Sequence, residues 1–197
     1  MILEGIVTTL DPEGLLNVAP MGPRIDSGFE RFVLRPYRSS TTYRNLKRQG
    51  EGVLHVVDDV LLLARATIGS ITDAPTRAAE LVRGQVLLGC CRYYEFRVTE
   101  VDESGERAAF HSETLAWGRI HDVFGFNRAR HSVLETAILA SRIDFLPAEG
   151  LGEELAKHRT IVEKTGDEPE VKAFGLLEDH IRDVARRRGL VLGTSTP

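Results

Sequence analysis

Cysteine is scarce in this sequence: only two are present among 197 residues, and they stand together as Cys90 and Cys91. Neighbouring residues of a strand point to opposite faces, so these two thiols are poorly placed to form a disulfide with each other. The absence of any Cys-x-x-Cys pair also argues against a metal site built on thiolates. We therefore expect two small apolar side chains in a protein of a reducing compartment, the cytoplasm.

Long apolar runs and an excess of positive charge are also absent. The longest apolar stretches, such as 60–64, are far too short to span a bilayer, and the first residues lack the basic region and cleavage site of a secretion signal. The net charge of −4 argues against a general affinity for nucleic acid or for an anionic membrane surface. A small basic pocket for one phosphate remains compatible with this charge.

The common nucleotide and nucleophile motifs are missing as well. No Gly-x-Gly-x-x-Gly element is present, which argues against a Rossmann site for nicotinamide, and no Gly-x-Ser-x-Gly element suggests a catalytic serine. The segment 164–167 looks like a phosphate loop but lacks the Walker framework, and a helix end at Gly166 explains it equally well. The candidate metal ligands are His111, His121, His131 and Asp122. Their spacing fits no common metal-binding motif, so we expect no metal.

The sequence does contain a series of strand patterns up to about residue 118. Alternating apolar residues and turn signals predict strands over 2–7, 15–19, 29–37, 53–57, 85–101 and 108–117. Hydroxyl residues before an amphipathic run closed by Gly50 predict a helix over 39–50, and Asp58 with Asp59 could cap a second helix that ends at 66. About six or seven strands with two short helices are typical of a small barrel.

The hydrophobic period changes to a helical one after residue 125. Helices are predicted near 127–142, 151–164 and 170–188, which gives an α+β fold with a barrel domain over 1–124 and a helical subdomain over 125–197. On the first of these helices, one side is apolar and comprises Phe126, Ala129, Val133, Ala137 and Ala140. On another side His131 and Glu135 lie one turn apart, close enough for a proton relay that contacts substrate; a solvated face is the alternative.

Two segments carry candidate cofactor-binding residues. Residues 35–42 place arginine and four hydroxyl residues before a helix, and a phosphate is bound by such cations, hydroxyls and free backbone N–H groups. Residues 17–22 end a strand with small side chains, and an extended backbone of this kind can lie against a flat aromatic ring. Ordinary helix capping and an ordinary Pro-Gly turn are the alternatives.

The order of these segments resembles a known class of barrel. Asn-x-Ala-Pro at one strand end, Arg-Pro-Tyr at the next, a hydroxyl-rich helix start with Asn-Leu, and then His-Val-Val resemble flavin reductases and pyridoxamine-phosphate-oxidase-like split barrels. More closely, the chain resembles the DUF447 family, described as FMN-binding split β-barrels. That likeness is carried by 3–9, 17–22, 126–131 with Glu135, Ala140 and Arg142, and 161–166.

The resemblance implies a homodimer that binds FMN at the subunit interface and transfers electrons or hydride to an unidentified small-molecule substrate. It implies that the flavin ring lies beside Asn17, Ala19 and Pro20. It implies a phosphate site formed by Arg35, Ser39, Ser40, Thr41 and Thr42, with Asn45 supporting the loop. His55 stands where such barrels often have asparagine, so it either hydrogen-bonds the ring edge or is a satisfied core residue.

Two other functions remain open at this point. The barrel could hold another planar cofactor, such as a deazaflavin or a pterin. Alternatively, it could be a binding or assembly module without turnover, in which any flavin is structural.

Overall fold

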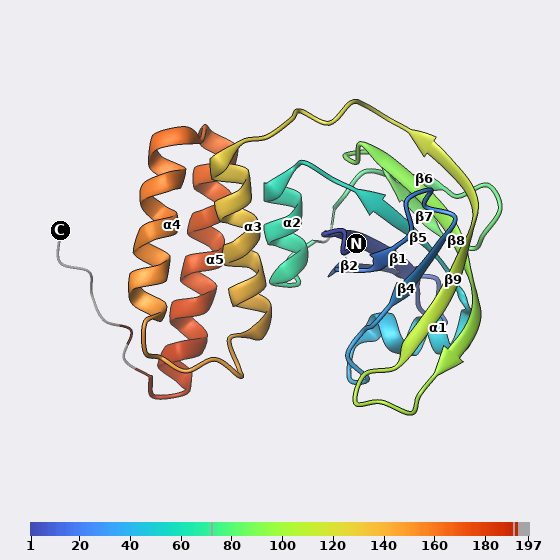
Figure 1. Cartoon of the computed structure of the whole chain (residues 1–197), viewed down its shortest axis with the longest axis horizontal. Coiled ribbons are helices and arrows are strands. Elements are labelled where there is room, and N and C mark those ends of the chain that lie inside the picture. The colour runs from blue at the N-terminus through green and yellow to red at the C-terminus, as the bar shows by residue number, and fades with distance from the viewer. Residues whose placement is uncertain (72, 191, 193–197) are drawn as a thin grey trace. The chain divides into compact units, whose positions relative to one another are not determined.

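The computed structural model describes residues 1–71, 73–190 and 192, and the chain divides into two compact units. The first unit comprises Met1–Asp58 and Ile71–Val123, and the second comprises Asp59–Ser70 and the chain from Phe124 onward. The strands (Figure 1) are β1 (Gly5–Leu10), β2 (Leu16–Met21), β3 (Arg24–Ile25), β4 (Arg31–Leu34), β5 (Glu51–Val56), β6 (Thr76–Ala78), β7 (Gln85–Leu87), β8 (Arg92–Asp102) and β9 (Ala109–Arg119). The helices are α1 (Thr41–Gln49), α2 (Val60–Thr67), α3 (Arg128–Arg142), α4 (Leu151–Thr165) and α5 (Glu168–Arg187).

The first unit is a curled antiparallel sheet of seven strands in the order β2-β1-β5-β8-β9-β4-β3. Its two edge strands, β2 and β3, follow each other in the chain with only Gly22 and Pro23 between them. The sheet must therefore curl until its edges approach each other. The N-terminal residues help to close the gap, because the Leu3 N–H donates to the Pro23 carbonyl at 3.1 Å and Ile2 forms a bridge with Arg24. The predicted split barrel is confirmed.

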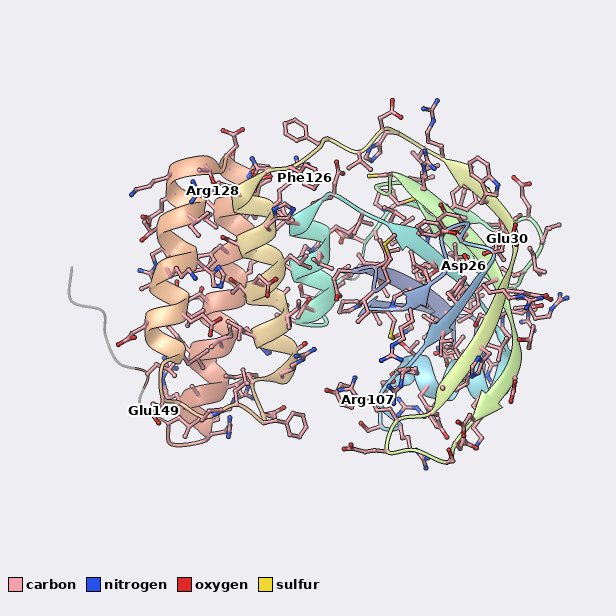
Figure 2. The ribbon with its side chains drawn as sticks, in the orientation of Figure 1. Asp26, Glu30, Arg107, Phe126, Arg128 and Glu149 are labelled. Atoms are coloured by element: carbon pink, nitrogen blue, oxygen red, sulfur yellow. The ribbon has the colours of Figure 1, made fainter. Side chains whose placement is uncertain are left out.

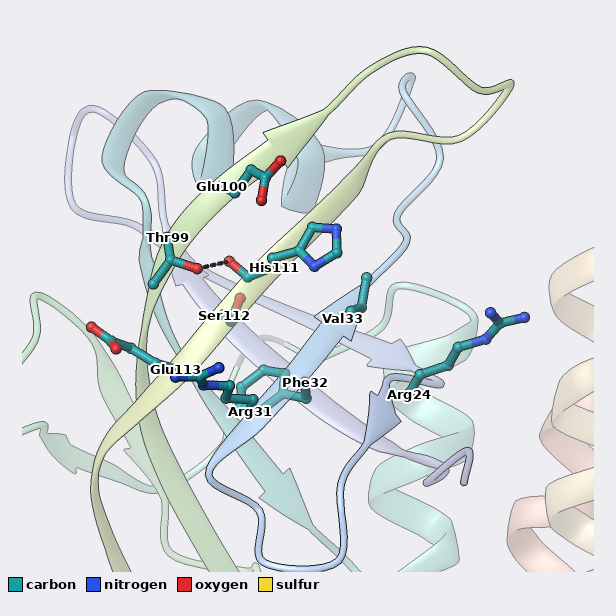
Figure 3. A pocket seen from close by; sticks show the side chains of 9 residues that line it. All are labelled: Arg24, Arg31, Phe32, Val33, Thr99, Glu100, His111, Ser112 and Glu113. Atoms are coloured by element: carbon teal, nitrogen blue, oxygen red, sulfur yellow. Dashed lines mark hydrogen bonds between the residues drawn. The ribbon is translucent and has the colours of Figure 1, made fainter.

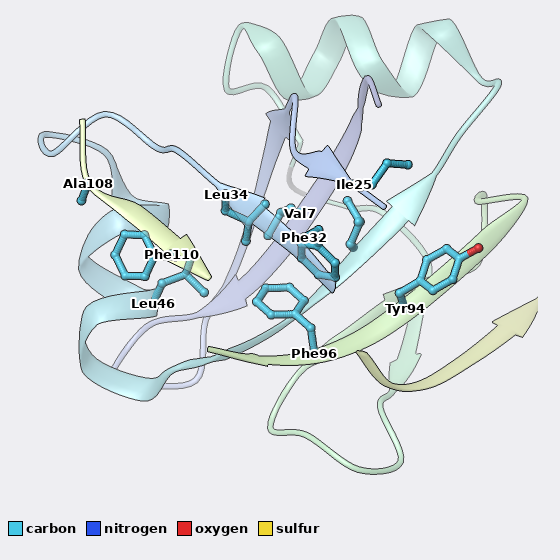
Figure 4. Close-up of a cluster of buried hydrophobic side chains, with 10 residues drawn as sticks. Val7, Ile25, Phe32, Leu34, Leu46, Tyr94, Phe96, Ala108 and Phe110 are labelled. Atoms are coloured by element: carbon cyan, nitrogen blue, oxygen red, sulfur yellow. The ribbon is translucent and has the colours of Figure 1, made fainter. Parts of the chain in front are cut away.

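Buried apolar side chains from the inner face of the sheet and from α1 fill this barrel (Figure 4). Phe96 of β8 is completely buried and packs edge-to-face on Phe32 of β4, with ring centroids 5.2 Å apart. Leu46 reaches the same core from α1, which fixes this helix against the sheet. The start of α1, where phosphate binding is predicted, is thereby held on a rigid scaffold.

The predicted strand over 85–101 is wrong in one respect. Residues 88–91 form a turn that separates β7 from β8, and β7 pairs with β6 in a small two-stranded sheet that the sequence pattern did not indicate. The alternation of apolar residues continues through this turn, and Gly89 is its only local break signal. Leu88, expected on the buried face, is consequently exposed.

The second unit is helical, and α2 belongs to it although it lies between strands in the sequence. Each of α2, α3 and α4 packs against α5, and α3 also packs against α2 and α4. The expected apolar side of α3 is buried at Ala129, Val133 and neighbouring positions. Phe126 is the exception: it precedes the helix and is 98% exposed (Figure 2). The final residues of the predicted 125–197 subdomain, 191 and 193–197, lie outside the described residues.

The junction between α4 and α5 is capped by polar side chains. Asp167 and Glu170 form a capping box at the start of α5, and Gly166 ends α4, so residues 164–167 are a helix junction. Glu170 also accepts a 3.0 Å hydrogen bond from Arg130 of α3. None of the described helices is both long and apolar enough to cross a lipid bilayer.

Candidate functional site

A polar network joins the two segments that the sequence analysis selected. The Asn17 side-chain amide on β2 donates to the Thr42 hydroxyl on α1 at 3.0 Å and to the Thr9 hydroxyl on β1 at 3.1 Å. The buried Asn45 amide donates to the same Thr9 hydroxyl at 3.0 Å. Strand β2 and the first turn of α1 are therefore held together by hydrogen bonds between side chains predicted to bind one cofactor.

The first turn of α1 has the features of an anion site. Ser40 is the N-cap, and its hydroxyl accepts from the Tyr43 N–H at 3.1 Å. Within the part of the chain that the structure describes, the N–H groups of Thr41 and Thr42 have no hydrogen-bond acceptor, and the turn contains no acidic residue. Free N–H groups at the positive end of a helix favour a bound anion.

Arg44 is a cation at this turn that the sequence analysis missed. Its guanidinium donates to the Ser39 carbonyl at 2.8 Å and to the Thr41 hydroxyl at 2.9 Å, so it lies along the predicted phosphate loop while remaining exposed. The signal was available, because a residue three positions after Thr41 on a helix shares its face. Arg35, the predicted cation, is also exposed and follows β4.

The loop before α1 is anchored to the hairpin that connects β8 and β9. The Arg38 guanidinium donates to the carbonyls of Glu103 and Gly105 at 2.5 and 2.8 Å. The Glu103 carboxylate accepts from Tyr43 and from Lys47, and these hydrogen bonds lower the pKa of Glu103 and raise that of Lys47. Both charges therefore persist at neutral pH, and the loop keeps its position.

Strand β2 offers an open backbone beside this turn. It is an edge strand, paired on one side only, and all of its residues are partly exposed, including Ala19 and Pro20. Small side chains on an edge leave room for a flat ring to approach the backbone. The predicted ring-binding residues are thus on an accessible surface.

His55 lies elsewhere, in the core of the barrel. Its side chain is completely buried, Nδ1 donates to the Ile6 carbonyl at 3.2 Å, and Nε2 accepts from the Leu87 N–H at 3.1 Å. Burial lowers the pKa of His55 to about 4, so the ring is neutral in the folded protein. With both nitrogens engaged by backbone groups, no atom remains for a flavin edge. This geometry favours the core role that the sequence left open, so His55 is not proposed as a flavin contact.

His131 and Glu135 are exposed on α3, as the solvated alternative predicts. No hydrogen bond or ion pair joins them among the described residues, and the His131 ring lies 5.9 Å from that of Phe126. Asn127 is the N-cap of α3: its side-chain Oδ1 accepts from the Arg130 N–H, and its side-chain Nδ2 donates to the Thr165 carbonyl. A catalytic role for His131 and Glu135 stays a prediction.

Comparison with known families bears on both parts of the chain. The protein-family model described as "Protein of unknown function (DUF447) N-terminal domain" matches residues 3–121 of the sequence. A second family model, described as "Protein of unknown function (DUF447)", matches residues 127–179. The chain belongs to the DUF447 family. The family resemblance stated from the sequence is confirmed.

Solved structures resemble this DUF447 chain in fold. The FMN-bound protein MM1853 from Methanosarcina mazei has a TM-score of 0.80 at 22% identity, over 91% of this chain and 94% of that one. The 2-nitrobenzoate 2-nitroreductase NbaA of Pseudomonas fluorescens has a TM-score of 0.51 at 17% identity, over 59% and 64% of the two chains. The flavoredoxin of Desulfovibrio vulgaris (Miyazaki F) has a TM-score of 0.51 at 13% identity, over 60% and 69%. These likenesses support a split barrel with an added helical part.

The DUF447 chain also has a cavity away from the predicted cofactor residues (Figure 3). Its volume is about 420 Å³, and it lies on β3, β4, β8 and β9. Arg31 and Glu113 face each other across adjacent strands in its wall, as do Glu100 and His111. It contains none of the residues predicted to bind FMN, and charged groups of both signs line it. We therefore place the candidate cofactor site at β2 and α1, where, among the described residues, the first helical turn has free N–H groups and no acidic residue.

The two cysteines are buried and free, and neither is suited to be a nucleophile. Burial raises the pKa of Cys90 to about 11, and burial together with the neighbouring Asp58 carboxylate raises that of Cys91 to about 12. Both thiols are thus protonated near neutral pH, and a protonated thiol is a weak nucleophile. The structure also brings Cys91 close to Asp58 and His121, a grouping that the sequence analysis did not consider.

Proposed function

We propose that this DUF447 chain binds FMN, with the phosphate at the first turn of α1 and the ring along β2. The observation that carries the proposal is the 3.0 Å hydrogen bond between Asn17 and Thr42, which joins the two predicted segments. The FMN bound by the similar M. mazei protein supports the same ligand.

The residues of α1 fit a phosphate group well. The N–H groups of Thr41 and Thr42 can donate to phosphate oxygens, and the Arg44 guanidinium can add a charge-assisted hydrogen bond. The neutral Asn17 amide, which donates to the hydroxyls of both Thr9 and Thr42, would orient the ligand without adding negative charge. This donor set prefers a phosphorylated cofactor over an uncharged flavin such as riboflavin.

We further propose a redox activity, in which the chain acts as a flavin-dependent reductase on a small molecule. Bound FMN supplies one- and two-electron transfer, while the protein contributes orientation and limits access of water. The similar nitroreductase and flavoredoxin support this reaction class. His131 and Glu135 are the residues to substitute once a substrate is known.

We also propose that the working form is a homodimer. The candidate ring site lies on an exposed sheet edge, so one chain alone leaves the ring open to water. A second copy could cover this edge and complete two equivalent pockets by two-fold symmetry.

Titration of the flavin-free protein with FMN and with riboflavin tests the site. We expect FMN to bind at least about tenfold more tightly than riboflavin, because hydrogen bonds to a charged group contribute ~1.5–3 kcal/mol. Arg44→Gln should weaken FMN binding by about tenfold and leave riboflavin binding unchanged. Flavin fluorescence quenching provides the measurement.

Arg48→Gln is the matched control, because Arg48 is an exposed cation in the last turn of the same helix. It removes the same charge and should leave FMN affinity within about twofold of wild type, since exposed charges are screened over short distances. Equal affinity for FMN and riboflavin, or an equal loss in both variants, would contradict phosphate binding at the first turn of α1.

A further inference from the structure

Three side chains with different metal-binding atoms meet at one end of three adjacent strands. Asp58 follows the end of β5, Cys91 directly precedes β8, and His121 follows the end of β9. One possible ligand atom from each residue lies within 4.8 Å of the others. Among the described residues, no other group of three histidine, cysteine or acidic side chains has its possible ligand atoms this close together.

The strand register explains why these residues meet. Arg92 of β8 pairs with Val56 of β5 on one side and with Arg119 of β9 on the other, so the residues just beyond these pairs share one end of the sheet. Backbone hydrogen bonds extend this order past the strands. The Cys91 N–H donates to the Val56 carbonyl at 2.8 Å, and the Ile120 N–H donates to the Cys91 carbonyl at 2.9 Å. These hydrogen bonds hold the backbone of Cys91 between the ends of β5 and β9, from which Asp58 and His121 follow.

We propose that Asp58, Cys91 and His121 form a binding site for Zn²⁺. Thiolate, imidazole and carboxylate are the three ligand types that zinc uses, and their mixture suits zinc better than the harder cations Mg²⁺ or Ca²⁺. Tetrahedral zinc holds its ligand atoms roughly 3.3–3.6 Å apart. Side-chain rotations that move these atoms by about 1 Å would therefore bring the three ligands to the spacing that zinc requires. On binding, the Cys91 thiol gives its proton to solvent and its sulfur bonds the metal.

The orientation of His121 favours coordination. Its Nδ1 lies 2.9 Å from the Asp122 backbone carbonyl, which requires the proton to be on Nδ1 and leaves a lone pair on Nε2. Such a second hydrogen bond is the usual arrangement of a zinc-bound histidine. The Asp122 side chain also forms an exposed 2.7 Å ion pair with Arg119 at the end of β9.

The proposed site is separate from the FMN proposal. It shares no residue with the first turn of α1 or with β2, and its test needs no flavin turnover. Three protein ligands leave a fourth position for water or a small anion, and the exposure of His121 lets an ion enter from solvent. Zinc at this point would link the ends of β5, β8 and β9.

Co²⁺ binding to the full chain tests this proposal. The protein is treated with a chelator and kept reduced with a phosphine, and Co²⁺ is then added while difference spectra are recorded against the same flavin content. We expect one Co²⁺ per chain, with a thiolate-to-metal charge-transfer band and tetrahedral d–d bands that Zn²⁺ abolishes by competition. Zn²⁺ should also raise the melting temperature.

Cys91→Ser should remove the charge-transfer band, and His121→Gln should weaken Co²⁺ binding by more than about tenfold. Cys90→Ser and His111→Gln are the matched controls and should bind Co²⁺ like wild type. Because His121 and His111 are both exposed, the histidine pair remains decisive if a cysteine variant does not fold. Absence of the charge-transfer band in wild type, or equal Co²⁺ binding by His121→Gln and His111→Gln, would overturn the proposal.

Discussion

His55 and Asn17 are polar side chains on strands of the same sheet, yet their surroundings give them different roles. Both ring nitrogens of His55 are used by backbone groups in the core, whereas the partly exposed Asn17 amide donates from an edge strand to the buried Thr42 hydroxyl of α1. The sequence gives both residues similar apolar neighbours. Only the pairing of strands determines that one is enclosed and the other remains accessible.

The enclosed histidine makes the stability of the barrel sensitive to acid. The pKa of His55 falls from 6.5 to about 4 on folding, chiefly because burial disfavours the charged ring. Between these pH values the unfolded chain binds a proton that the folded chain does not, so stability is complete above pH 6.5 and decreases as the pH falls towards 4. We expect a loss of about 3 kcal/mol from this residue.

Urea unfolding from pH 7 to pH 4 measures this effect. Far-UV circular dichroism follows the loss of secondary structure, because Trp117, the single tryptophan, is 63% exposed and its fluorescence changes little on unfolding. His55→Asn should reduce the pH dependence relative to wild type, because asparagine does not titrate. His131→Gln, a change at an exposed histidine, should preserve it. The same pH dependence in His55→Asn and wild type would show that His55 is not the group responsible.

Helix boundaries were predictable because their signals are local. The predicted helix over 39–50 is α1 with Ser40 as N-cap and Gly50 as C-cap, and the φ angle of 69° at Gly50 is one that glycine adopts without strain. The predicted cap Asp59 likewise begins α2. The division of 85–101 was not predictable in this way, since the partner of β7 is β6, which shows no clear strand pattern in the sequence.

Close packing between β1 and β5 requires a particular small residue. A Cβ at Gly5 would lie 2.5 Å from the His55 carbonyl oxygen, which belongs to the rigid backbone of β5. Gly5→Ala must therefore push the two strands apart, and we expect a loss of ~1–3 kcal/mol in the free energy of unfolding.

Gly105→Ala is the control for this change, because its Cβ would have no neighbour closer than 3.5 Å. It should alter the free energy of unfolding by less than about 0.5 kcal/mol. Thermal or urea unfolding followed by far-UV circular dichroism compares the two variants. Equal stability of Gly5→Ala and Gly105→Ala would contradict the close approach of β1 and β5.

At the scale of the whole molecule, fold class and family could be predicted from the sequence, whereas the grouping of distant residues could not. The order of the Asn17 and Thr41–Thr42 segments suggested one site because it resembles the order found in flavin-binding split barrels. Asp58, Cys91 and His121 carry none, since their proximity depends on the register of β5, β8 and β9. Cytoplasmic location, inferred from the scarcity of cysteine, remains a prediction.

At the scale of the whole molecule, we expect two copies of the chain to form a homodimer. Sedimentation equilibrium should give about twice the chain mass of 21.9 kDa if two copies complete the cofactor sites. Charged substitutions on the free edge of β2, such as Val18→Glu, should shift the protein towards monomers and weaken FMN binding together. A monomer that binds FMN with full affinity would show that the site is complete within one chain.

FMN binding is the central claim, and the chromophore of the purified full-length protein tests it most directly. An absorption spectrum followed by heat release and mass spectrometry identifies any bound cofactor and its amount per chain. We predict flavin absorption bands and about one FMN released per chain, before or after reconstitution with added FMN. Release of a deazaflavin or a pterin in place of FMN would contradict the account. So would a protein that stays colourless with excess FMN and shows no rise in melting temperature, where a saturated site should add ~3 kcal/mol of stability.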